Sequence, residues 1–211
     1  MRILVAGAGA VGGYFGGRLA QAGRDVTFLV LPKRAEQIQA QGLRILSPMH
    51  GDFTVRPKTI TAAQITSPYD VIFLSVKSYD LAAAINDFAP TVGPQTVIIP
   101  VLNGMQHIDV LTKRYGEHAG LGWVCFVANE IDSQGRIVQL ADFQSLTYGE
   151  LNGKKTSRIE AVHQVFSGAG VEAAISTDIL RNMWEKWVWL ATVGTITCLL
   201  RGNIGEIVAV P

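Results

Sequence analysis

The chain has 211 residues, of which 48% are hydrophobic and 17% are charged, and its formal net charge is +1. This length and apolar content suffice for one α/β domain with a large core and part of a second domain. The near-zero charge indicates neither a nucleic acid nor an anionic membrane as a partner. The 2 cysteines and 4 histidines are far apart and match no metal or redox motif. We therefore expect no metal site and buried, reduced thiols in a cytoplasmic protein. Because Met1 directly precedes the first predicted strand, we also expect no targeting peptide.

The first thirty residues predict a βαβ unit that binds a dinucleotide. Arg2 to Ala6 is a short apolar run typical of a buried parallel strand, residues 11–21 form an amphipathic helix, and residues 25–30 form a second strand. A G-x-G-x-x-G motif lies between the first strand and the helix, where it can hold a pyrophosphate at the helix N-terminus. Its cofactor-binding candidates are Gly7, Ala8, Gly9, Ala10, Val11 and Gly12.

Each glycine of this motif has a separate mechanical role. Gly7 permits the tight turn out of the strand, Gly9 lets the backbone approach the phosphates, and Gly12 lets the helix pack closely on the strand. The alternative is an ordinary glycine-bearing turn between a strand and a helix. The position of the motif, after one strand and before a helix and a second strand, favours dinucleotide binding.

The end of the second strand favours NADP over NAD. An NAD site usually has Asp or Glu about 20 residues after the motif, where the carboxylate binds the ribose 2′-hydroxyl. Val30 and Leu31 occupy this region here, and the cations Lys33 and Arg34 follow. We therefore predict NADPH as the cofactor, with Arg34 favoured over Lys33 because a planar guanidinium suits a phosphate. The alternative is a solvated, basic start of the next helix.

Strands and helices continue to alternate as far as residue 115. The apolar pattern predicts helices over 33–41, 80–88 and 106–115, and strands over 43–46, 53–56, 69–76 and 96–99. Lys77 comes at the end of the strand 69–76, and Asn103 follows the strand 96–99. Both positions lie at the edge where open α/β sheets bind their ligands.

From Gly120 onward, consecutive strands replace the alternation. We expect strands over 121–130, 136–140 and 145–149, with a turn at 141–142, as an antiparallel addition at the edge of the sheet. A helix over 157–167 and a strand over 171–175 complete a Rossmann-type, doubly wound domain of residues 1–176.

Residues 178–200 predict one long helix that opens a second, all-helical domain over 177–211. The stretch 187–200 has no charged residue, yet it is too short to span a bilayer. A helix that is apolar all round must be buried on all sides. Because residues 201–211 do not supply that cover, we expect this second domain to be incomplete in the chain.

Four motifs in this order resemble the ketopantoate reductases, the NADPH-dependent 2-dehydropantoate 2-reductase family. They are the glycine motif, Val76-Lys77-Ser78-Tyr79, Leu102-Asn103-Gly104-Met105 and Asn182-Met183-Trp184-Glu185-Lys186. In that family a Rossmann domain meets an all-helical domain, and the active site lies in the cleft between them. The resemblance implies reduction of 2-dehydropantoate to pantoate, a step towards pantothenate and coenzyme A.

The resemblance also implies roles for three side chains. Lys186 is the catalytic general acid, which protonates the carbonyl oxygen as hydride reaches the carbonyl carbon. Asn103 binds the substrate or the nicotinamide ribose, and Lys77 lies near the cofactor and the substrate carboxylate. Each has an ordinary alternative: a snorkelling lysine for Lys186, a turn residue for Asn103 and a surface lysine for Lys77.

Three departures from the family leave other functions open. A serine and a glutamate on later helices of the family have no counterpart in this chain, and Leu190 replaces an asparagine one turn after the lysine. Leu31 replaces the usual arginine, which leaves the 2′-phosphate to Lys33 and Arg34. The alternatives are an NADPH-dependent reductase of another 2-oxo acid and a non-catalytic dinucleotide-binding fragment. The apolar C-terminal helix predicts association into a homo-oligomer such as a dimer, or poor solubility.

Overall fold

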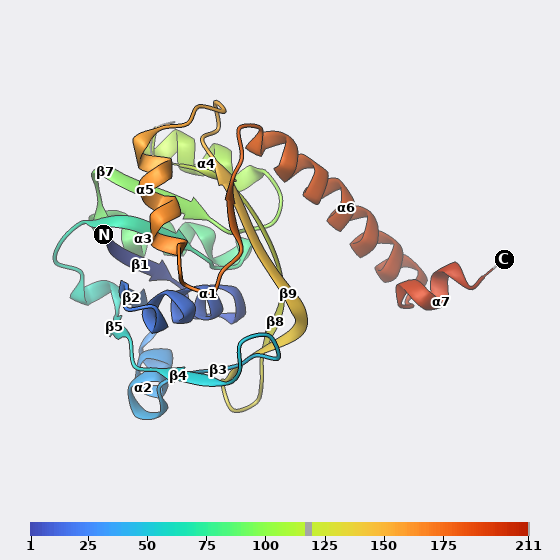
Figure 1. Ribbon diagram of the computed structural model, residues 1–211, viewed down its shortest axis with the longest axis horizontal. Coiled ribbons are helices and arrows are strands. Elements are labelled where there is room, and N and C mark those ends of the chain that lie inside the picture. The colour runs from blue at the N-terminus through green and yellow to red at the C-terminus, as the bar shows by residue number, and fades with distance from the viewer. Residues whose placement is uncertain (117–119, 211) are drawn as a thin grey trace.

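The computed structural model describes residues 1–116 and 120–210, and its strands and helices alternate through the first half of the chain (Figure 1). Residues 117–119 and Pro211, the last residue of the expected second domain, lie outside the described part. The first half contains β1 (Arg2–Ala6), α1 (Ala10–Gln21), β2 (Asp25–Leu29), α2 (Pro32–Gln41), β3 (Leu43–Leu46), β4 (Phe53–Val55), β5 (Lys58–Ile60), β6 (Tyr69–Leu74), α3 (Leu81–Phe88), β7 (Val92–Pro100) and α4 (Gln106–Tyr115). The second half contains β8 (Gly122–Ile131), β9 (Ile137–Gly149), α5 (Ser157–Phe166), β10 (Ala173–Ile175), α6 (Ile179–Leu200) and α7 (Ile204–Val208).

The first sheet is parallel and has the strand order β5-β2-β1-β6-β7. β1 lies at its centre, where Val5 pairs with Phe28 on one side and with Phe73 on the other. Both faces of the sheet are covered, which explains why its central strands are continuous apolar runs. Because β2 and β6 lie on opposite sides of β1, the crevice of the doubly wound fold opens at the C-terminal end of β1. The predicted Rossmann-type fold is confirmed.

A second sheet contains the later strands together with the hairpin β3–β4. Its order is β10-β9-β3-β4, and β8 pairs antiparallel with β9. The addition starts at the edge strand β7, as predicted, through a parallel bridge between Ile98 and Gly120. It is mixed rather than purely antiparallel, because β3 and β10 both run parallel to β9.

One local prediction in these sheets is wrong, and one strand was not predicted. The break expected at residues 141–142 does not occur, because β9 runs unbroken over Ile137–Gly149. Val127 pairs with Gln144 and Asn129 with Gln139, so residues 140–143 form a bulge opposite a single residue of β8. The short edge strand β5 was not predicted; its three residues, Lys-Thr-Ile, are too few to show a period.

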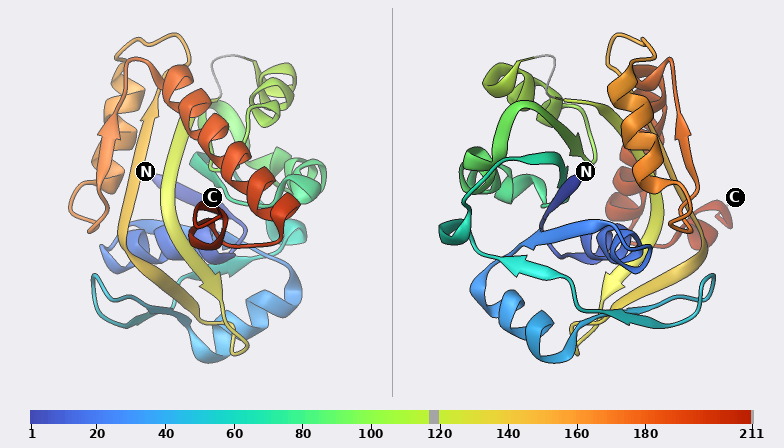
Figure 2. Two further views of the ribbon diagram at one scale, coloured as in Figure 1. Left: turned by 90° about the vertical axis from the view of Figure 1, so that its right-hand side faces the viewer. Right: turned by 60° about the vertical axis from the view of Figure 1, so that its left-hand side comes forward.

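The helices divide the protein into layers (Figure 2). Between the two sheets, α1 and α5 contribute to one large core in which the rings of Phe73, Trp123 and Phe166 lie within 6.4 Å of one another. On the opposite face of the first sheet, α3 and α4 form a second core with Ile72 and Phe88 at its centre. Both faces of the first sheet are therefore packed against a hydrophobic core.

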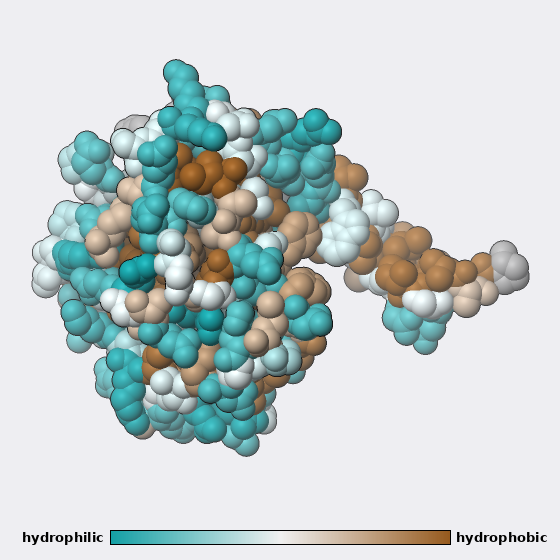
Figure 3. Space-filling view, viewed as in Figure 1, coloured by the Kyte–Doolittle hydropathy of each residue, from teal (hydrophilic) through white to brown (hydrophobic). Residues whose placement is uncertain are grey.

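Helix α6 lies across the outer face of β8 and then extends away from the rest of the protein (Figures 1 and 2). Ile179 and Met183 in its first turns are buried against Val124. Farther along, Trp189, Leu199 and other large apolar side chains are exposed. The end of the molecule that extends to the right in Figure 3 is largely hydrophobic (brown). The burial expected for this helix is therefore confined to its N-terminal turns. No helix in the described residues is both long enough and apolar enough to cross a membrane.

The two cysteines differ in environment, which corrects the expectation that both are buried. Both are free thiols, but only Cys125 is buried, whereas Cys198 is exposed. Cys198 belongs to the part of α6 that other elements do not cover. Burial raises the pKa of the Cys125 thiol to about 12, although Lys186 opposes the shift. Cys125 is therefore an unreactive thiol at neutral pH.

Candidate active site

The glycine loop joins β1 to α1 at the crevice of the first sheet. Gly7 has φ +99°, a conformation that favours glycine, and its N–H donates to Leu29 O at 3.0 Å. A Cβ atom on Gly12 would lie 1.9 Å from Ser75 Oγ and 2.3 Å from Gly7 O. A Cβ atom on Gly9 would meet no atom within 4 Å. Gly12 is thus required for packing, whereas the space beside Gly9 is open to a ligand.

The N-terminus of α1 is suited to a phosphate. Its N-cap residue Gly9 supplies no side-chain cap, and the first turn has no acidic residue. The first N–H groups of the helix therefore point towards the crevice with the positive end of the helix dipole. Asn129 of β8 donates from Nδ2 to Ala10 O at 3.3 Å and ties this turn to the second sheet.

Arg34 lies against the same loop, whereas Lys33 is exposed. Arg34 Nε donates to Ala8 O at 3.2 Å, and Nη1 donates to Gln37 Oε1 at 2.6 Å and to Gly135 O at 2.9 Å. Nη2 is buried and has no hydrogen-bond partner among the described residues. Burial lowers the pKa of the guanidinium below its ordinary value. The structure therefore brings Arg34, and not Lys33, into contact with the loop.

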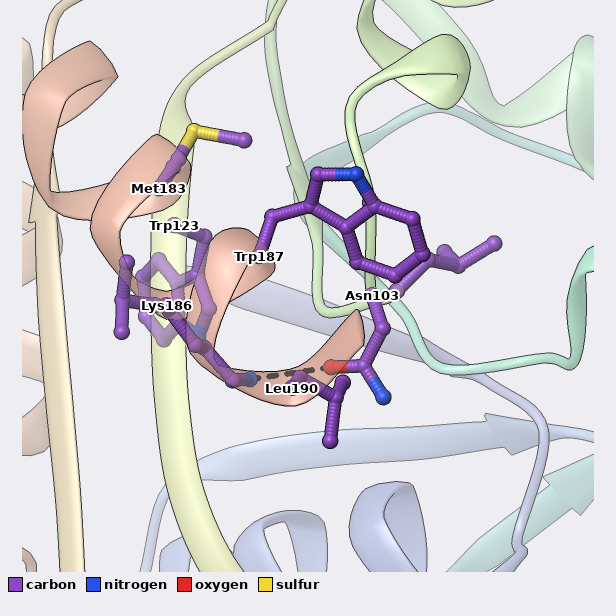
Figure 4. Close-up of a pocket in the computed structure, with 9 residues that line it drawn as sticks. Asn103, Trp123, Met183, Lys186, Trp187 and Leu190 are labelled. Atoms are coloured by element: carbon purple, nitrogen blue, oxygen red, sulfur yellow. Dashed lines mark hydrogen bonds between the residues drawn. The ribbon is translucent and has the colours of Figure 1, made fainter. Parts of the chain in front are cut away.

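Lys186 and Asn103, which lie 83 residues apart in the chain, are in direct contact (Figure 4). Lys186 Nζ on α6 donates to Asn103 Oδ1 at 2.9 Å, and it donates to the backbone oxygen of Cys125 on β8 at 2.6 Å. Nζ also lies 5.5 Å from the centre of the Phe126 ring. Burial lowers the pKa of the Lys186 ammonium. Two of its three N–H bonds are used by the protein, so one is available to a ligand.

A small hollow, partly open to solvent, surrounds this contact. Among its lining side chains, Asn103 and Lys186 hydrogen-bond to each other (Figure 4), and the indole N–H of Trp123 is buried without a hydrogen-bond partner among the described residues. The others are mainly apolar: Leu102, Gly104, Val124, Met183, Trp187 and Leu190. The site therefore presents one cation and one amide in apolar surroundings.

Lys77 stands apart from this pair. It comes three residues after the end of β6, at the C-terminal edge of the sheet, and its side chain is exposed. Its side chain forms no hydrogen bond or ion pair within residues 1–116 and 120–210. The structure thus places it at the predicted edge without bringing it into contact with Lys186 or Asn103.

Two further residues of the site were not predicted. The Ser75 hydroxyl lies within donating distance of Ala6 O at 3.0 Å and of Gly7 O at 2.9 Å. These contacts connect the end of β6 to the start of the glycine loop. Cys125 contributes only a backbone carbonyl, which no side-chain pattern can reveal. For Ser75 the signal was present, because a polar residue ends the apolar run of β6 opposite the glycine motif.

No group of three or more His, Cys, Asp or Glu in the described part of the chain is placed to hold a metal.

The parallel sheet with its glycine loop, next to the hydrogen-bonded pair of Lys186 and Asn103, defines a Rossmann-type protein of the oxidoreductase class. Residues 3–153 match the model of one such family, described as ketopantoate reductase PanE/ApbA. The chain belongs to this family.

Relatives of known sequence and structure agree with this assignment. The chain is 40% identical over 209 residues to the uncharacterized oxidoreductase YkpB of Bacillus subtilis, covering 99% of this chain and 68% of that protein. It is 27% identical over 231 residues to a 2-dehydropantoate 2-reductase of Mesorhizobium japonicum, covering 99% and 70% of the two chains. The crystal structure of 2-dehydropantoate 2-reductase from Geobacter metallireducens matches with a TM-score of 0.90 at 30% identity, covering 99% and 69%. The chain thus spans about two thirds of these relatives.

Proposed function

We propose that this protein is an NADPH-dependent reductase that converts 2-dehydropantoate (ketopantoate) into pantoate. The observation that carries the proposal is the hydrogen bond between Lys186 Nζ and Asn103 Oδ1 beside the crevice of the first sheet. Relatives named 2-dehydropantoate 2-reductase support the choice of substrate. The reaction belongs to the route to pantothenate and coenzyme A, and we place it in the cytoplasm.

The side chains of the pair have distinct parts in this mechanism. NADPH supplies the hydride that reaches the 2-oxo carbon. Negative charge then develops on the carbonyl oxygen, and the Lys186 ammonium stabilises this charge and donates the proton. Asn103 and the Cys125 carbonyl each accept a hydrogen bond from Nζ, so they orient the ammonium and leave its third N–H for the substrate. The mainly apolar side chains around the pair lower the local dielectric constant and so strengthen this interaction.

The residues around the glycine loop fit a dinucleotide. The open space at Gly9 and the uncapped N-terminus of α1 suit the pyrophosphate, with Gly7, Ala8, Gly9, Ala10, Val11 and Gly12 forming the loop. We assign the 2′-phosphate to Arg34, with Lys33 as an outer cation, because Arg34 contacts the loop. We assign Lys77 and Asn103 to the nicotinamide half of the site, because both follow strands at the C-terminal edge of the sheet.

A second candidate is the reduction of another 2-oxo acid on the same scaffold. The observation in its favour is Leu190, which lines the hollow beside Lys186 and offers no hydrogen bond to a substrate hydroxyl. A third candidate is a dinucleotide-binding fragment without catalysis.

We further propose that residues 1–176 form the cofactor domain and 177–211 the start of a helical domain. We also propose that the exposed part of α6 mediates a homo-oligomer.

The test is NADPH oxidation by the chain with and without ketopantoate, with NADH as the cofactor control. We expect turnover that needs ketopantoate and is faster with NADPH, and we expect Lys186→Ala to abolish it while NADPH affinity changes by no more than a few fold. Unchanged turnover in Lys186→Ala would remove this residue from the mechanism. NADPH binding without turnover of ketopantoate, but with turnover of another 2-oxo acid, would establish the second candidate.

A further inference from the structure

Helix α2 is joined to the tip of the β8–β9 hairpin by two side chains. Gln37 Nε2 donates to Gln134 O at 3.1 Å, and Arg34 Nη1 donates to Gly135 O at 2.9 Å. Gln37 Oε1 also accepts from Arg34 Nη1 at 2.6 Å. The Gln37 amide therefore bonds to the hairpin through its nitrogen and to the Arg34 guanidinium through its oxygen.

Hydrogen bonds to Asp132 order the tip of the β8–β9 hairpin. The Asp132 carboxylate accepts from the backbone N–H of Gln134 and of Arg136, each at 2.9 Å, and from Arg136 Nε at 2.6 Å. Gly135 permits the approach, because a Cβ atom there would lie 2.0 Å from Gln37 Nε2. Hydrogen bonds within the turn thus position the Gln134 and Gly135 carbonyls independently of Arg34 and Gln37.

All the partners of Arg34 are uncharged. Its acceptors are two backbone carbonyls and one amide, and the ion pairs formed by the described residues involve other side chains. The arrangement fixes the guanidinium plane without neutralising its charge. A carboxylate in place of the Gln37 amide would still accept from Arg34 Nη1, but it would lose the bond to Gln134 O and would cancel the charge that an anion needs.

We infer that Gln37 is a positioning residue, which with the Gln134–Gly135 carbonyls holds Arg34 against the glycine loop and sets the preference for a 2′-phosphorylated dinucleotide. This inference rests on the proposed function. Holding a long, flexible side chain in place before the ligand arrives lowers the entropic cost of binding. Because only NADPH has the 2′-phosphate, loss of this order weakens NADPH binding and leaves NADH binding unchanged.

The experiment measures dissociation constants for NADPH and for NADH by quenching of tryptophan fluorescence in the full chain. The variants are Gln37→Met, Gln37→Glu and Arg34→Met. The matched control is Gln39→Met on the same helix, whose amide bonds to Thr59 Oγ1 at 3.1 Å, away from the hairpin. We expect Gln37→Met to weaken NADPH binding about tenfold and Gln37→Glu to weaken it more. NADH binding should change less than twofold in both, and Gln39→Met should match the unmodified chain.

The outcomes separate this inference from the proposed function. If Arg34→Met lowers the NADPH preference and Gln37→Met does not, the positioning role is overturned and the assignment of Arg34 to the phosphate stands. If Arg34→Met leaves the preference unchanged, the assignment of Arg34 fails and the positioning role falls with it. Equal weakening of NADPH and NADH by Gln37→Met would also overturn the inference, since it would indicate a loss of structure. Tighter NADPH binding in Gln37→Met would overturn it by showing that the contact restrains Arg34.

Discussion

At the scale of single residues, Gly9 and Gly12 occupy one short loop for opposite physical reasons. Gly12 is surrounded by protein: a methyl group there would collide with Ser75 Oγ and with the Gly7 carbonyl. Gly9 faces open space and has φ −79°, which any residue adopts. The folded protein therefore needs glycine at position 12, whereas only a ligand would need it at position 9.

We predict that alanine substitutions separate these two roles. Gly12→Ala should lower the free energy of unfolding by about 2 kcal/mol, because backbone and helix must move apart. Gly9→Ala should leave that free energy within about 0.5 kcal/mol of its original value and weaken both NADPH and NADH binding at least tenfold. Chemical denaturation and fluorescence titration measure the two effects. Equal dinucleotide affinity in Gly9→Ala would place the pyrophosphate elsewhere.

At the scale of secondary-structure elements, α6 combines two different environments in one helix. Its first turns pack on β8, and Lys186 reaches from there to Asn103 and the Cys125 carbonyl. Its later turns expose a series of large apolar side chains, among them Leu199 at 75% exposure. Exposed apolar area of this extent is uncommon in monomeric proteins and indicates an interaction surface.

We predict that the 211-residue chain self-associates through this part of α6. Its mass measured by light scattering should rise with concentration, and Leu199→Glu should suppress the rise because it places a charge in the contact. Leu140→Glu is the matched control, since Leu140 is 59% exposed but lies in the bulge of β9. A constant monomer mass at high concentration, or equal effects of both variants, would count against association through α6.

At the scale of the whole molecule, the layered core encloses a titratable group outside the candidate site. His107 on α4 is only 3% exposed, and its Nε2 has no hydrogen-bond partner within the described part of the chain. Burial lowers the pKa of its imidazole from 6.5 to about 4, although Asp109 opposes the shift. The unfolded chain therefore binds a proton on this group at a higher pH than the folded chain does.

This difference in pKa predicts a specific loss of stability in acid. The contribution of His107 is fully present above pH 6.5 and is lost as the pH falls to about 4, with a total of about 3 kcal/mol. His107→Leu should match the unmodified protein at pH 7.5 and unfold at higher denaturant concentration at pH 4.5. Gln106→Leu, at the exposed neighbouring position, is the control. The prediction fails if His107→Leu and the unmodified protein lose stability in parallel between these pH values.

Patterns of neighbouring residues were sufficient to predict the Rossmann sheet. The contacts that backbone carbonyls make in the site could not be predicted from such patterns. The apolar strands, the glycine loop and the edge positions of Asn103 and Lys77 follow from local spacing, and the role of Lys186 follows from resemblance. The bulge in β9 was missed because Ala141 and Asp142 are equally typical of a turn. The contacts of Lys186 with the Cys125 carbonyl and of Arg34 with the Gly135 carbonyl depend on how two sheets meet. Backbone carbonyls are the same in every residue, so their use leaves no mark in the sequence.

The course of β8 restricts where this protein can tolerate a change in length. The Cys125 carbonyl in the first half of the strand accepts from Lys186, Asn129 near its C-terminal end donates to α1, and the Gly135 carbonyl in the following hairpin accepts from Arg34. Deleting one residue between these contacts would turn the side chains beyond it to the opposite face and misplace at least one of the three. Added residues are instead found on β9, at the exposed bulge 140–143. Insertions and deletions should therefore accumulate on β9 during evolution, while β8 keeps its length.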